Sequence, residues 1–354
     1  MQPIELNKRI DTLDYLRGFA LLGIILVNIP GLMWINLPDT SVDVAYNRFL
    51  TLFVEGKFFT IFSFLFGVGF YIFISRAMAK NENAYFLFVR RIIILLLIGL
   101  VHFYFQPGEA LTIYAIFGLI ALPFYKVRKE INLTIGLILL AVTAYFGFKI
   151  AMPFPLILLG LAAGQYRIFE KIHDNRKRIV ILTVIMSFIS VGGLLYQWHY
   201  VPEAMVNFDQ MTEDELKVHV TNIEKFTLIG LQFSPFVSAF YVGLLMLLLQ
   251  RPLCQVLLSP LKDYGRMALT NYLGQTALII IIGNAFHLID NIRFIQSLWI
   301  CIGIYIFQLL FSKIWLKYFT FGPFEWLWRM GTYWTVPSLL KTSTNSKNIP
   351  KKSN

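Results

Sequence analysis

The chain alternates long apolar runs with short polar connections. Many of these runs approach the length of about 20 helical residues that a hydrocarbon core of about 30 Å requires. Because backbone groups in a bilayer must find hydrogen bonds within the chain, such runs form helices. The pattern predicts ten membrane-spanning helices, at about 14–34, 58–79, 92–106, 111–125, 131–150, 154–169, 179–198, 227–250, 267–288 and 294–312.

The composition agrees with this pattern. Hydrophobic residues make up 57% of the 354 residues and charged residues 14%, whereas soluble domains carry about 25% charged residues. We therefore expect an all-α integral membrane protein, with one transmembrane domain over 1–334 and a polar tail over 335–354. The first apolar run is too long for a cleavable signal and is expected to stay in the protein. Cys254 and Cys301 share no ligand-like spacing, so neither a disulfide nor a metal site is expected.

Basic residues fall mainly in alternate connections. With the N-terminus inside, all but six of the 31 Lys and Arg residues lie on the cytoplasmic side. Inner loops of membrane proteins carry such an excess, so both termini are expected to be cytoplasmic. The net charge of +11 is thus a topology signal, and the expected partner is the lipid bilayer rather than a nucleic acid.

Two polar or aromatic segments interrupt this regular alternation. The longest outer loop, about 199–226, is acidic, and Thr212 with Glu215 three residues later forms a capping-box pattern. This pattern predicts a short extracytoplasmic helix, with a solvated loop as the alternative. Segment 320–334 is crowded with aromatic residues around Arg329 and suits the membrane interface. The tail beyond it, 335–354, has the composition of a disordered segment.

The first predicted helix carries a polar stripe. At 100° per residue, Asp14, Arg17 and Asn28 fall within an arc of about 60° on one helix face. Asp14 and Arg17 lie at the cytoplasmic end, and Asn28 lies roughly 16 Å deeper. The acid and the base could simply pair near the interface, and Asn28 could bond a neighbouring helix. Alternatively, the stripe belongs to a site.

The third predicted helix has a similar arrangement. Arg91 and His102 lie on one helix face, and Glu109 follows just after the helix. A neutral histidine here could act as a general base that Glu109 orients. The alternative is a histidine that is hydrogen-bonded to a neighbouring helix.

Other residues are candidates for a binding site. Arg17, Arg90, Arg91 and Arg266 could contact the phosphates of a nucleotide-bearing donor, or could serve only the positive-inside pattern. Ser63 with Gly67 and Gly69, and the GLAAG segment at 160–164, are typical of close helix packing. A polar cluster within the ninth apolar run could either line a cavity or form hydrogen bonds between helices. It contains Asn271, Tyr272 and Gln275. No phosphate-binding P-loop, zinc-ligand spacing or serine elbow is present.

Five blocks of this chain resemble the successive blocks of the YeiB-like family of bacterial multi-pass inner-membrane proteins. They are LDYLRGFALLGIILVNI, KFFTIFSFLFGVGF, RRIIILLLIGLVH, GRMALTNYLGQTAL and FGPFEWLWRMGTY. The resemblance runs from about residue 9 to 334. It implies a multi-pass protein of the bacterial plasma membrane.

The YeiB-like family is similar in turn to the transmembrane acyltransferases, which move an acyl group, commonly from acetyl-CoA, to a glycan. Arg17 matches the arginine of their first-span pattern, but Asn28 stands where the sugar O-acetyltransferases have a histidine. The lysosomal heparan-glucosaminide N-acetyltransferase resembles this chain better, because an asparagine also follows its first-span FRG. This relation implies acetyl-CoA or another acyl-CoA as a co-substrate.

Three functions fit the predicted topology. The first is an acyltransferase in which the arginines hold the donor, His102 and Glu109 deprotonate an acceptor, and Asn28 stabilises the developing oxyanion or fixes the histidine. The acceptor would be an envelope glycan or another small extracytoplasmic molecule. The second is a small-solute transporter that uses the same polar groups. The third is a membrane protein without enzymatic activity.

Overall fold

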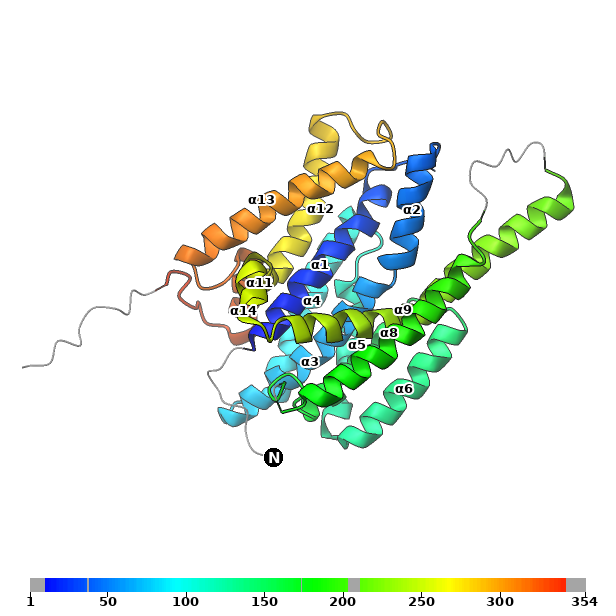
Figure 1. Cartoon of the computed structure of the whole chain (residues 1–354). Helices are drawn as coiled ribbons and strands as arrows, with labels where there is room; N and C mark the ends of the chain where they lie inside the picture. Colours follow the sequence, from blue (N-terminus) through cyan, green and yellow to red (C-terminus); the bar gives the residue numbers. More distant parts are fainter. Residues whose placement is uncertain (1–9, 37, 173, 203–210, 342–354) are drawn as a thin grey trace, which may run out of the picture.

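The computed structural model describes residues 10–36, 38–172, 174–202 and 211–341, which form a bundle of helices (Figure 1). The helices are α1 (Asp11–Leu32), α2 (Ser41–Phe53), α3 (Lys57–Ala79), α4 (Ala84–Phe105), α5 (Leu111–Ile120), the 3₁₀ helix η1 (Leu122–Lys126), α6 (Lys129–Tyr145), α7 (Pro153–Gln165), α8 (Arg176–Trp198), α9 (Glu213–Leu248), α10 (Pro252–Leu257), α11 (Ser259–Arg266), α12 (Ala268–Ala285), α13 (Gln296–Tyr318) and α14 (Pro323–Tyr333).

Six helical stretches among the described residues are long and apolar enough to cross a membrane. They are α1, α2 and α3 taken together, α4, α8, α9 and α13. The other four predicted spans correspond to α5, α6, α7 and α12, which have 10, 17, 13 and 18 residues. The all-helical membrane protein expected from the sequence is therefore confirmed, while the number of ten spans stays a prediction.

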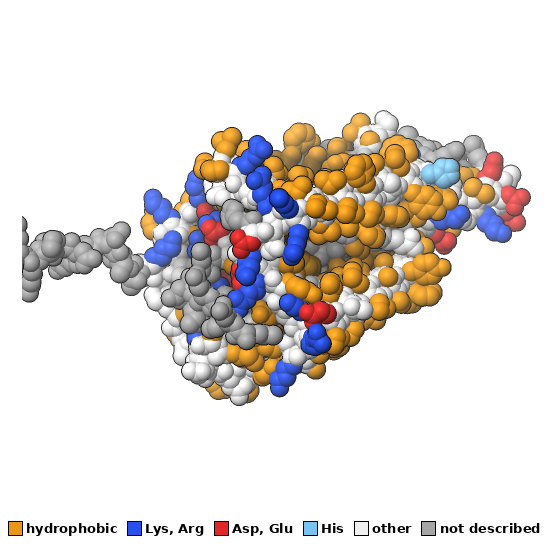
Figure 2. Space-filling model, turned by 60° about the horizontal axis from the view of Figure 1, so that its bottom comes forward, with side chains coloured by type: hydrophobic (Ala, Val, Ile, Leu, Met, Phe, Trp, Pro, Cys, Tyr) orange, Lys and Arg blue, Asp and Glu red, His pale blue; other side chains and the backbone are white. Residues whose placement is uncertain are grey.

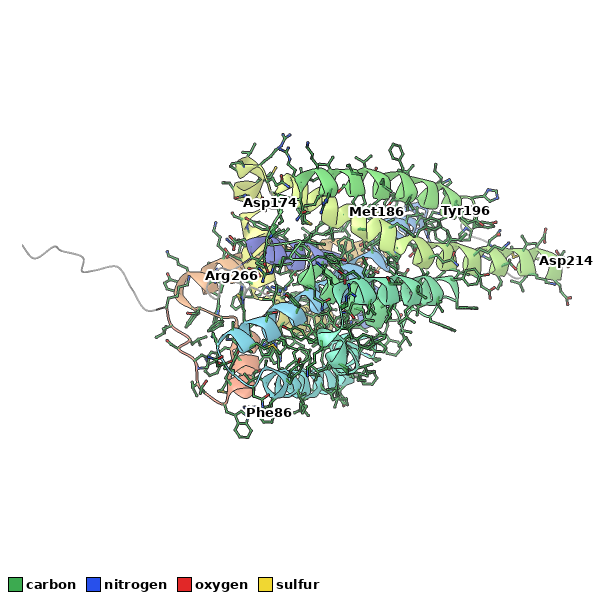
Figure 3. All side chains as sticks on the ribbon, turned by 90° about the horizontal axis from the view of Figure 1, so that it is seen from below. Phe86, Asp174, Met186, Tyr196, Asp214 and Arg266 are labelled. Atoms are coloured by element: carbon green, nitrogen blue, oxygen red, sulfur yellow. The ribbon has the colours of Figure 1, made fainter. Side chains whose placement is uncertain are left out.

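Charge is distributed along the bundle. Basic side chains gather toward one end, apolar side chains cover the middle, and acidic side chains cluster at the far tip (Figure 2). Arg266 and Asp214 lie at these two opposite ends (Figure 3). We call the end that carries Arg266 the basic end. The cytoplasmic location of this end is a prediction from the positive-inside pattern.

Helix α2 was not predicted from the sequence. Its polar face interrupts the apolar run, while Tyr46 and Leu50 on its other face are buried. Asp43 fixes the helix at its start, because its backbone N–H is capped by the Thr40 hydroxyl at 3.2 Å and its carboxylate accepts the Ile295 N–H at 2.7 Å. These contacts tie α2 to the residue that precedes α13.

The capping box is present at the start of α9. The Thr212 hydroxyl caps Glu215, and the Glu215 carboxylate accepts the Thr212 N–H at 2.9 Å. The prediction of a separate short helix is wrong, since α9 continues without a break to Leu248. The physical reason is that no Gly or Pro interrupts the segment before Gly230.

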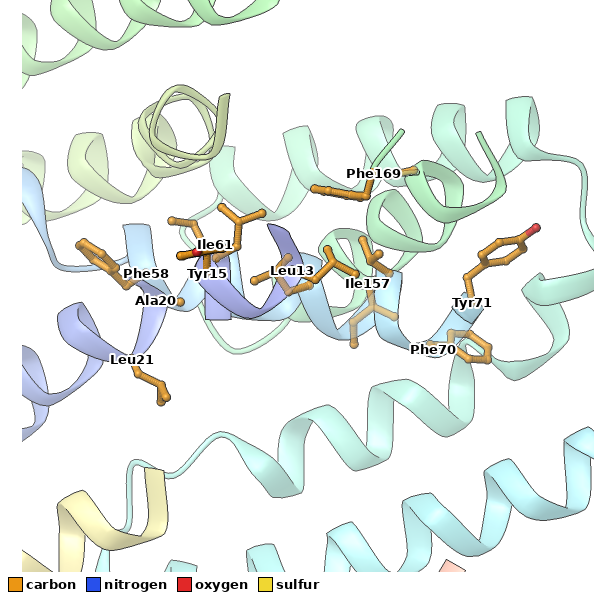
Figure 4. Close-up of a cluster of buried hydrophobic side chains, with 14 of the residues drawn as sticks. Leu13, Tyr15, Ala20, Leu21, Phe58, Ile61, Phe70, Tyr71, Ile157 and Phe169 are labelled. Atoms are coloured by element: carbon orange, nitrogen blue, oxygen red, sulfur yellow. The ribbon is translucent and has the colours of Figure 1, made fainter. Parts of the chain in front are cut away.

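The buried core is built mainly where α1, α3 and α7 meet (Figure 4). Glycines allow α3 and α7 to touch through their backbones. A Cβ atom at Gly67 would lie 2.1 Å from the Ile157 carbonyl oxygen, and one at Gly160 would lie 2.0 Å from that of Phe64. The packing role expected for these glycines is therefore observed.

The C-terminal part of the chain returns to the bundle. The predicted interfacial segment contains α14, and residues 335–341 run back to the end of α13. There, Thr320 N–H donates to the Leu339 carbonyl at 2.9 Å, and Lys341 N–H donates to that of Tyr318 at 3.0 Å. Most of the predicted tail, 342–354, lies outside the described residues.

Candidate functional site

A cavity of about 470 Å³ lies at the basic end, between α1, α3, α4, α11, α12 and α14. We call it the arginine cavity. Its described lining contains six cationic side chains, from Arg17, Arg76, Lys80, Arg91, Arg266 and Arg329. It contains three carboxylates, from Asp14, Glu82 and Glu325. Because cations outnumber carboxylates in a partly dehydrated hollow, the cavity favours a ligand with several negative charges.

Close packing of α1 against α11 brings Arg17 and Arg266 to the same wall. Gly18 and Gly265 make the contact, since a Cβ atom at Gly265 would lie 1.9 Å from the Asp14 carbonyl oxygen. Arg17 lies one helical turn after Asp14, and its Nη1 atom is 2.9 Å from Asp14 Oδ1. The Asp14 side chain is buried, whereas that of Arg17 is 30% exposed. This pair fixes the orientation of the Arg17 guanidinium, and the side chain stays partly exposed to solvent.

Arg91 is held on the α4 side by aromatic rings. Its guanidinium carbon lies 3.4 Å from the centre of the Trp328 ring and 4.9 Å from that of Phe73. The indole N–H of Trp328 also donates to the Arg91 carbonyl oxygen at 2.8 Å. Stacked rings cover the flat faces of a guanidinium and leave its N–H edges for a planar anion. Helix α14 therefore fixes the orientation of the Arg91 guanidinium in the cavity wall.

Glu325 attaches α14 to the beginning of α12. Its Oε1 atom accepts the Leu269 N–H at 2.6 Å and the Thr270 N–H at 3.1 Å. The Thr270 hydroxyl donates to the other carboxyl oxygen. Burial raises the pKa of the Glu325 carboxyl above its ordinary value, and these hydrogen bonds oppose that rise. Glu325 thus builds the cavity wall while adding a titratable acid to it.

The structure brings together three of the four arginines that the sequence singled out. Arg17, Arg91 and Arg266 line the arginine cavity, but Arg90 does not. Its guanidinium donates to the Gly331 carbonyl at 3.2 Å and lies 4.4 Å from the centre of the Trp334 ring. Arg90 therefore contacts the α14 segment from outside the cavity.

Two cavity arginines were missed in the sequence. Arg76 counted only as part of the positive-inside pattern, and Arg329 only as part of the interfacial aromatic segment. Arg329 lies 4.5 Å above the Phe321 ring, in the same type of contact as Arg91 makes with Trp328. The available signal was the segment FEWLWRM, in which two tryptophans precede Arg329.

Apolar and tyrosine side chains form the rest of the cavity lining. Leu111, Tyr114 and Tyr272 all contribute to it. Ser63, which the sequence grouped with the packing glycines, is fully buried behind Tyr114, with 3.3 Å between the two hydroxyl oxygens. We call the part of the cavity next to Leu111, Tyr114 and Tyr272 its floor.

His102 lies close to the floor but does not line the cavity. It is buried in α4, where its Nε2 atom is 2.9 Å from the Thr276 hydroxyl and its Nδ1 atom is 3.7 Å from Glu109 Oε2. Its ring centre lies 5.0 Å from that of Tyr272. Gly99 permits the approach of the Glu109 loop, since a Cβ atom there would lie 3.2 Å from Glu109 Oε1. The predicted histidine and acid are therefore neighbours.

Glu109 has a second role at the start of α5. Its two carboxylate oxygens accept the Leu111 and Thr112 N–H groups, each at 2.7 Å. An anion is favoured at a helix N-terminus, where N–H groups lack partners within the helix. Glu109 is thus fixed as a hydrogen-bond acceptor beside His102.

The side chains of His102, Thr276 and Gln106 form a chain of polar contacts. The Thr276 hydroxyl donates to the Gln106 side-chain oxygen at 2.7 Å. A hydroxyl has one proton to give, so the Thr276 oxygen is the acceptor for His102 Nε2 at 2.9 Å. His102 Nδ1 has no hydrogen-bond partner among the described residues, and the nearby Glu109 carboxylate lies 3.7 Å away.

Asn28 does not join this group. It is half-buried in α1 and does not line the arginine cavity, and its side chain has no hydrogen-bond partner among the described residues. The same helix stripe therefore separates into Asp14 and Arg17, which line the cavity, and Asn28, which lies apart from it.

Asn271 and Gln275 belong to a different polar region. The Asn271 amide donates to the Tyr264 carbonyl and the Ser312 hydroxyl, each at 2.9 Å. The Gln275 amide lies 2.6 Å from the Tyr264 hydroxyl, and the Gln308 amide donates to the Asn271 carbonyl at 3.0 Å. We call these five residues the amide network. Its members are buried and bond one another across α11, α12 and α13.

Metal ligands are not grouped in the described part of the chain. No set of three or more His, Cys, Asp or Glu side chains there could hold a metal ion. Cys301 is buried and Cys254 half-buried, and both are free thiols.

These features define a helical membrane protein with a cationic cavity at one end. Comparison with known proteins places the chain in a family. The chain belongs to the YeiB-like family, and residues 163–335 match the family described as "Protein of unknown function (DUF418)". This matched segment includes Arg266, Tyr272 and Arg329, while Arg17, Arg91 and His102 lie before it.

Several bacterial relatives cover nearly the whole chain. An "uncharacterized 39.9 kDa protein in amylase 3'region" of Bacillus acidopullulyticus is 57% identical over 96% of this chain and 99% of its own length. YxaH of Bacillus subtilis is 28% identical over 94% of this chain and 96% of its own. YeiB of Escherichia coli is 26% identical over 94% and 98%, respectively. No solved structure matches the chain.

Proposed function

We propose that this chain is an acyltransferase of the bacterial plasma membrane, with both termini in the cytoplasm. The arginine cavity would bind the phosphates of an acyl-CoA-type donor from the cytoplasmic side. The acyl group would pass to an envelope glycan or to another small extracytoplasmic acceptor. The observation that carries this proposal is the arginine cavity itself, about 470 Å³ in volume and rich in guanidinium groups.

The chemistry of the cavity supports a phosphate-bearing ligand. Guanidinium forks match phosphate oxygens in pairs, and several arginines around one hollow suit a ligand with more than one phosphate. The volume lies within the range of about 300–1,000 Å³ that is usual for ligand pockets. Phe62, Leu65 and Leu95 add an apolar wall that suits an uncharged, acyl-bearing part of the donor.

The positions of Arg91 and His102 on α4 support a division of labour. The two residues are 11 positions apart on one helix, which places them roughly 16 Å apart along its axis. A donor with an extended arm between its phosphates and its acyl group would span this separation. His102 would accept the proton of the acceptor, and the Glu109 carboxylate would stabilise the imidazolium that forms.

The proposal is tested with membrane vesicles that contain the protein and acetyl-labelled acetyl-CoA. We expect label to appear in envelope material with the wild type and to be lost with His102→Ala at equal amounts of folded protein. His287→Ala is the matched control, since His287 is an exposed histidine that does not line the arginine cavity. Protein that neither binds nor hydrolyses acetyl-CoA, in vesicles that show solute flux, would make it a transporter.

A further inference from the structure

Tyr272 of α12 has a buried hydroxyl group whose proton lacks an acceptor. The side chain is 6% exposed, and its oxygen accepts the Ala110 N–H at 3.3 Å. No described residue accepts the Tyr272 proton in return. A buried donor without an acceptor costs about 1–3 kcal/mol, so such a group commonly marks a place where another molecule binds.

The position of Tyr272 identifies what this molecule must reach. The residue lines the floor of the arginine cavity, and its ring contacts that of His102 at a tilt of 63°. Among the described residues, Tyr272 thus both lines the cavity and contacts the His102 ring. A group bound beside it lies between the donor cavity and the proposed base.

We propose that the Tyr272 hydroxyl donates a hydrogen bond to the carbonyl oxygen of the donor's acyl group and stabilises the charge that develops there. This inference rests on the acyl transfer proposed above. The acceptor oxygen or nitrogen attacks the thioester carbon and gives its proton to His102. The carbon–sulfur bond then breaks, and the leaving thiolate takes the proton back from His102. Through this sequence Tyr272 keeps its own proton.

Tyr264 of the amide network provides a comparison outside the cavity. It is also buried and does not line the arginine cavity. Its hydroxyl donates to the Gln308 side-chain oxygen at 3.0 Å. Tyr264 therefore has an internal acceptor where Tyr272 has none. Removing the two hydroxyl groups should have different consequences.

The test measures acetyl transfer from acetyl-CoA, in proteoliposomes of the full-length chain supplied with envelope extract. We expect Tyr272→Phe to lower kcat by about 100-fold, the usual effect of losing one oxyanion donor, with KM for acetyl-CoA changed less than about threefold. We expect Tyr264→Phe to keep kcat per folded molecule within about threefold of the wild type, because Tyr264 lies outside the cavity and its hydroxyl has its acceptor in Gln308. The unfolding temperature of each variant is measured alongside its kinetic constants, so that a loss of stability can be recognised.

The outcomes separate the two proposals. A wild type that transfers no acetyl group overturns the acyltransferase function and the Tyr272 role together. An active wild type with an equally active Tyr272→Phe overturns only the Tyr272 role. A Tyr272→Phe protein that unfolds earlier and raises KM as much as it lowers kcat assigns Tyr272 a structural role, which also contradicts the inference.

Discussion

The arginine cavity and the amide network are two buried polar regions in apolar helices, and they differ in charge and in the space that they enclose. In the amide network, side-chain amides and hydroxyls bond one another across α11, α12 and α13. In the cavity, guanidinium groups surround a hollow of about 470 Å³ with fewer carboxylates than cations. Polar residues in membrane helices are therefore a candidate site where they line a hollow with unbalanced charge, and a packing feature where they only bond one another.

The first test of this difference removes one positive charge from the cavity. Arg91→Gln removes a guanidinium that is stacked on Trp328 and faces the ligand space. We expect the affinity for acetyl-CoA to fall about 100-fold, because losing one partner of a buried charge pair costs about 3 kcal/mol. Equilibrium binding to the protein in detergent measures this change.

Arg128→Gln is the matched control for Arg91→Gln. It makes the same change of charge at an exposed arginine whose neighbour is Glu130, outside the cavity. Its affinity should stay within about twofold of the wild type, since exposed charges are screened. Equal losses in the two variants would mean that general surface charge, and not the cavity, attracts the ligand.

The amide network should respond in stability rather than in binding. Asn271→Ala leaves the Ser312 hydroxyl and the Tyr264 carbonyl without their amide donor. We expect the free energy of unfolding to fall by about 2 kcal/mol, with acetyl-CoA affinity per folded molecule unchanged. Thermal or denaturant unfolding in detergent measures it, and Asn284→Ala, an exposed asparagine of the same helix, is the control.

A result in which Asn271→Ala weakens ligand binding but not stability would reverse the roles of the two regions. The amide network would then belong to the site. A loss in Asn284→Ala equal to that in Asn271→Ala would mean that helix propensity, rather than the network, accounts for the effect.

The sequence could identify the polar residues but not their partners. It placed Arg90 and Arg91 together, because adjacent residues share the same charge pattern. They point about 100° apart on α4, and only the position of α14 decides which one faces the cavity. Likewise, the sequence grouped Asn271, Tyr272 and Gln275. The packing of α11 and α13 divides them between the amide network and the cavity floor.

Local patterns were more informative about the fold. The capping box at Thr212 and Glu215 depends on residues three positions apart and was recognised correctly. Helix α2 was missed because its buried face packs on distant parts of the chain, among them Phe294 and Ile295 just before α13. Similarly, the sequence predicted an interfacial segment at 320–334, but the role of α14 as a cavity wall depends on contacts with α4 and α12. Such long-range contacts leave little trace in a single sequence.

The smallest expected effect concerns Glu325, the carboxyl that is shared between α14 and the cavity wall. Its pKa in the folded protein is raised above the ordinary value of 4.5, mainly by burial. The folded state therefore holds its proton at pH values where the unfolded state has lost it. Stability from this group is fully present below about pH 4.5 and is lost as the pH rises through the raised pKa.

Glu325→Gln removes this titration while keeping a neutral acceptor for the Leu269 and Thr270 N–H groups. We expect Tm of the wild type to decline by a few degrees as the pH rises from about 4.5 toward neutrality, and that of Glu325→Gln to stay flatter. Glu82→Gln, which changes an exposed carboxyl of the same cavity, should keep the wild-type slope. If Glu325→Gln kept that slope as well, the pH dependence would come from another group, and Glu325 would serve the cavity only as the attachment of α14.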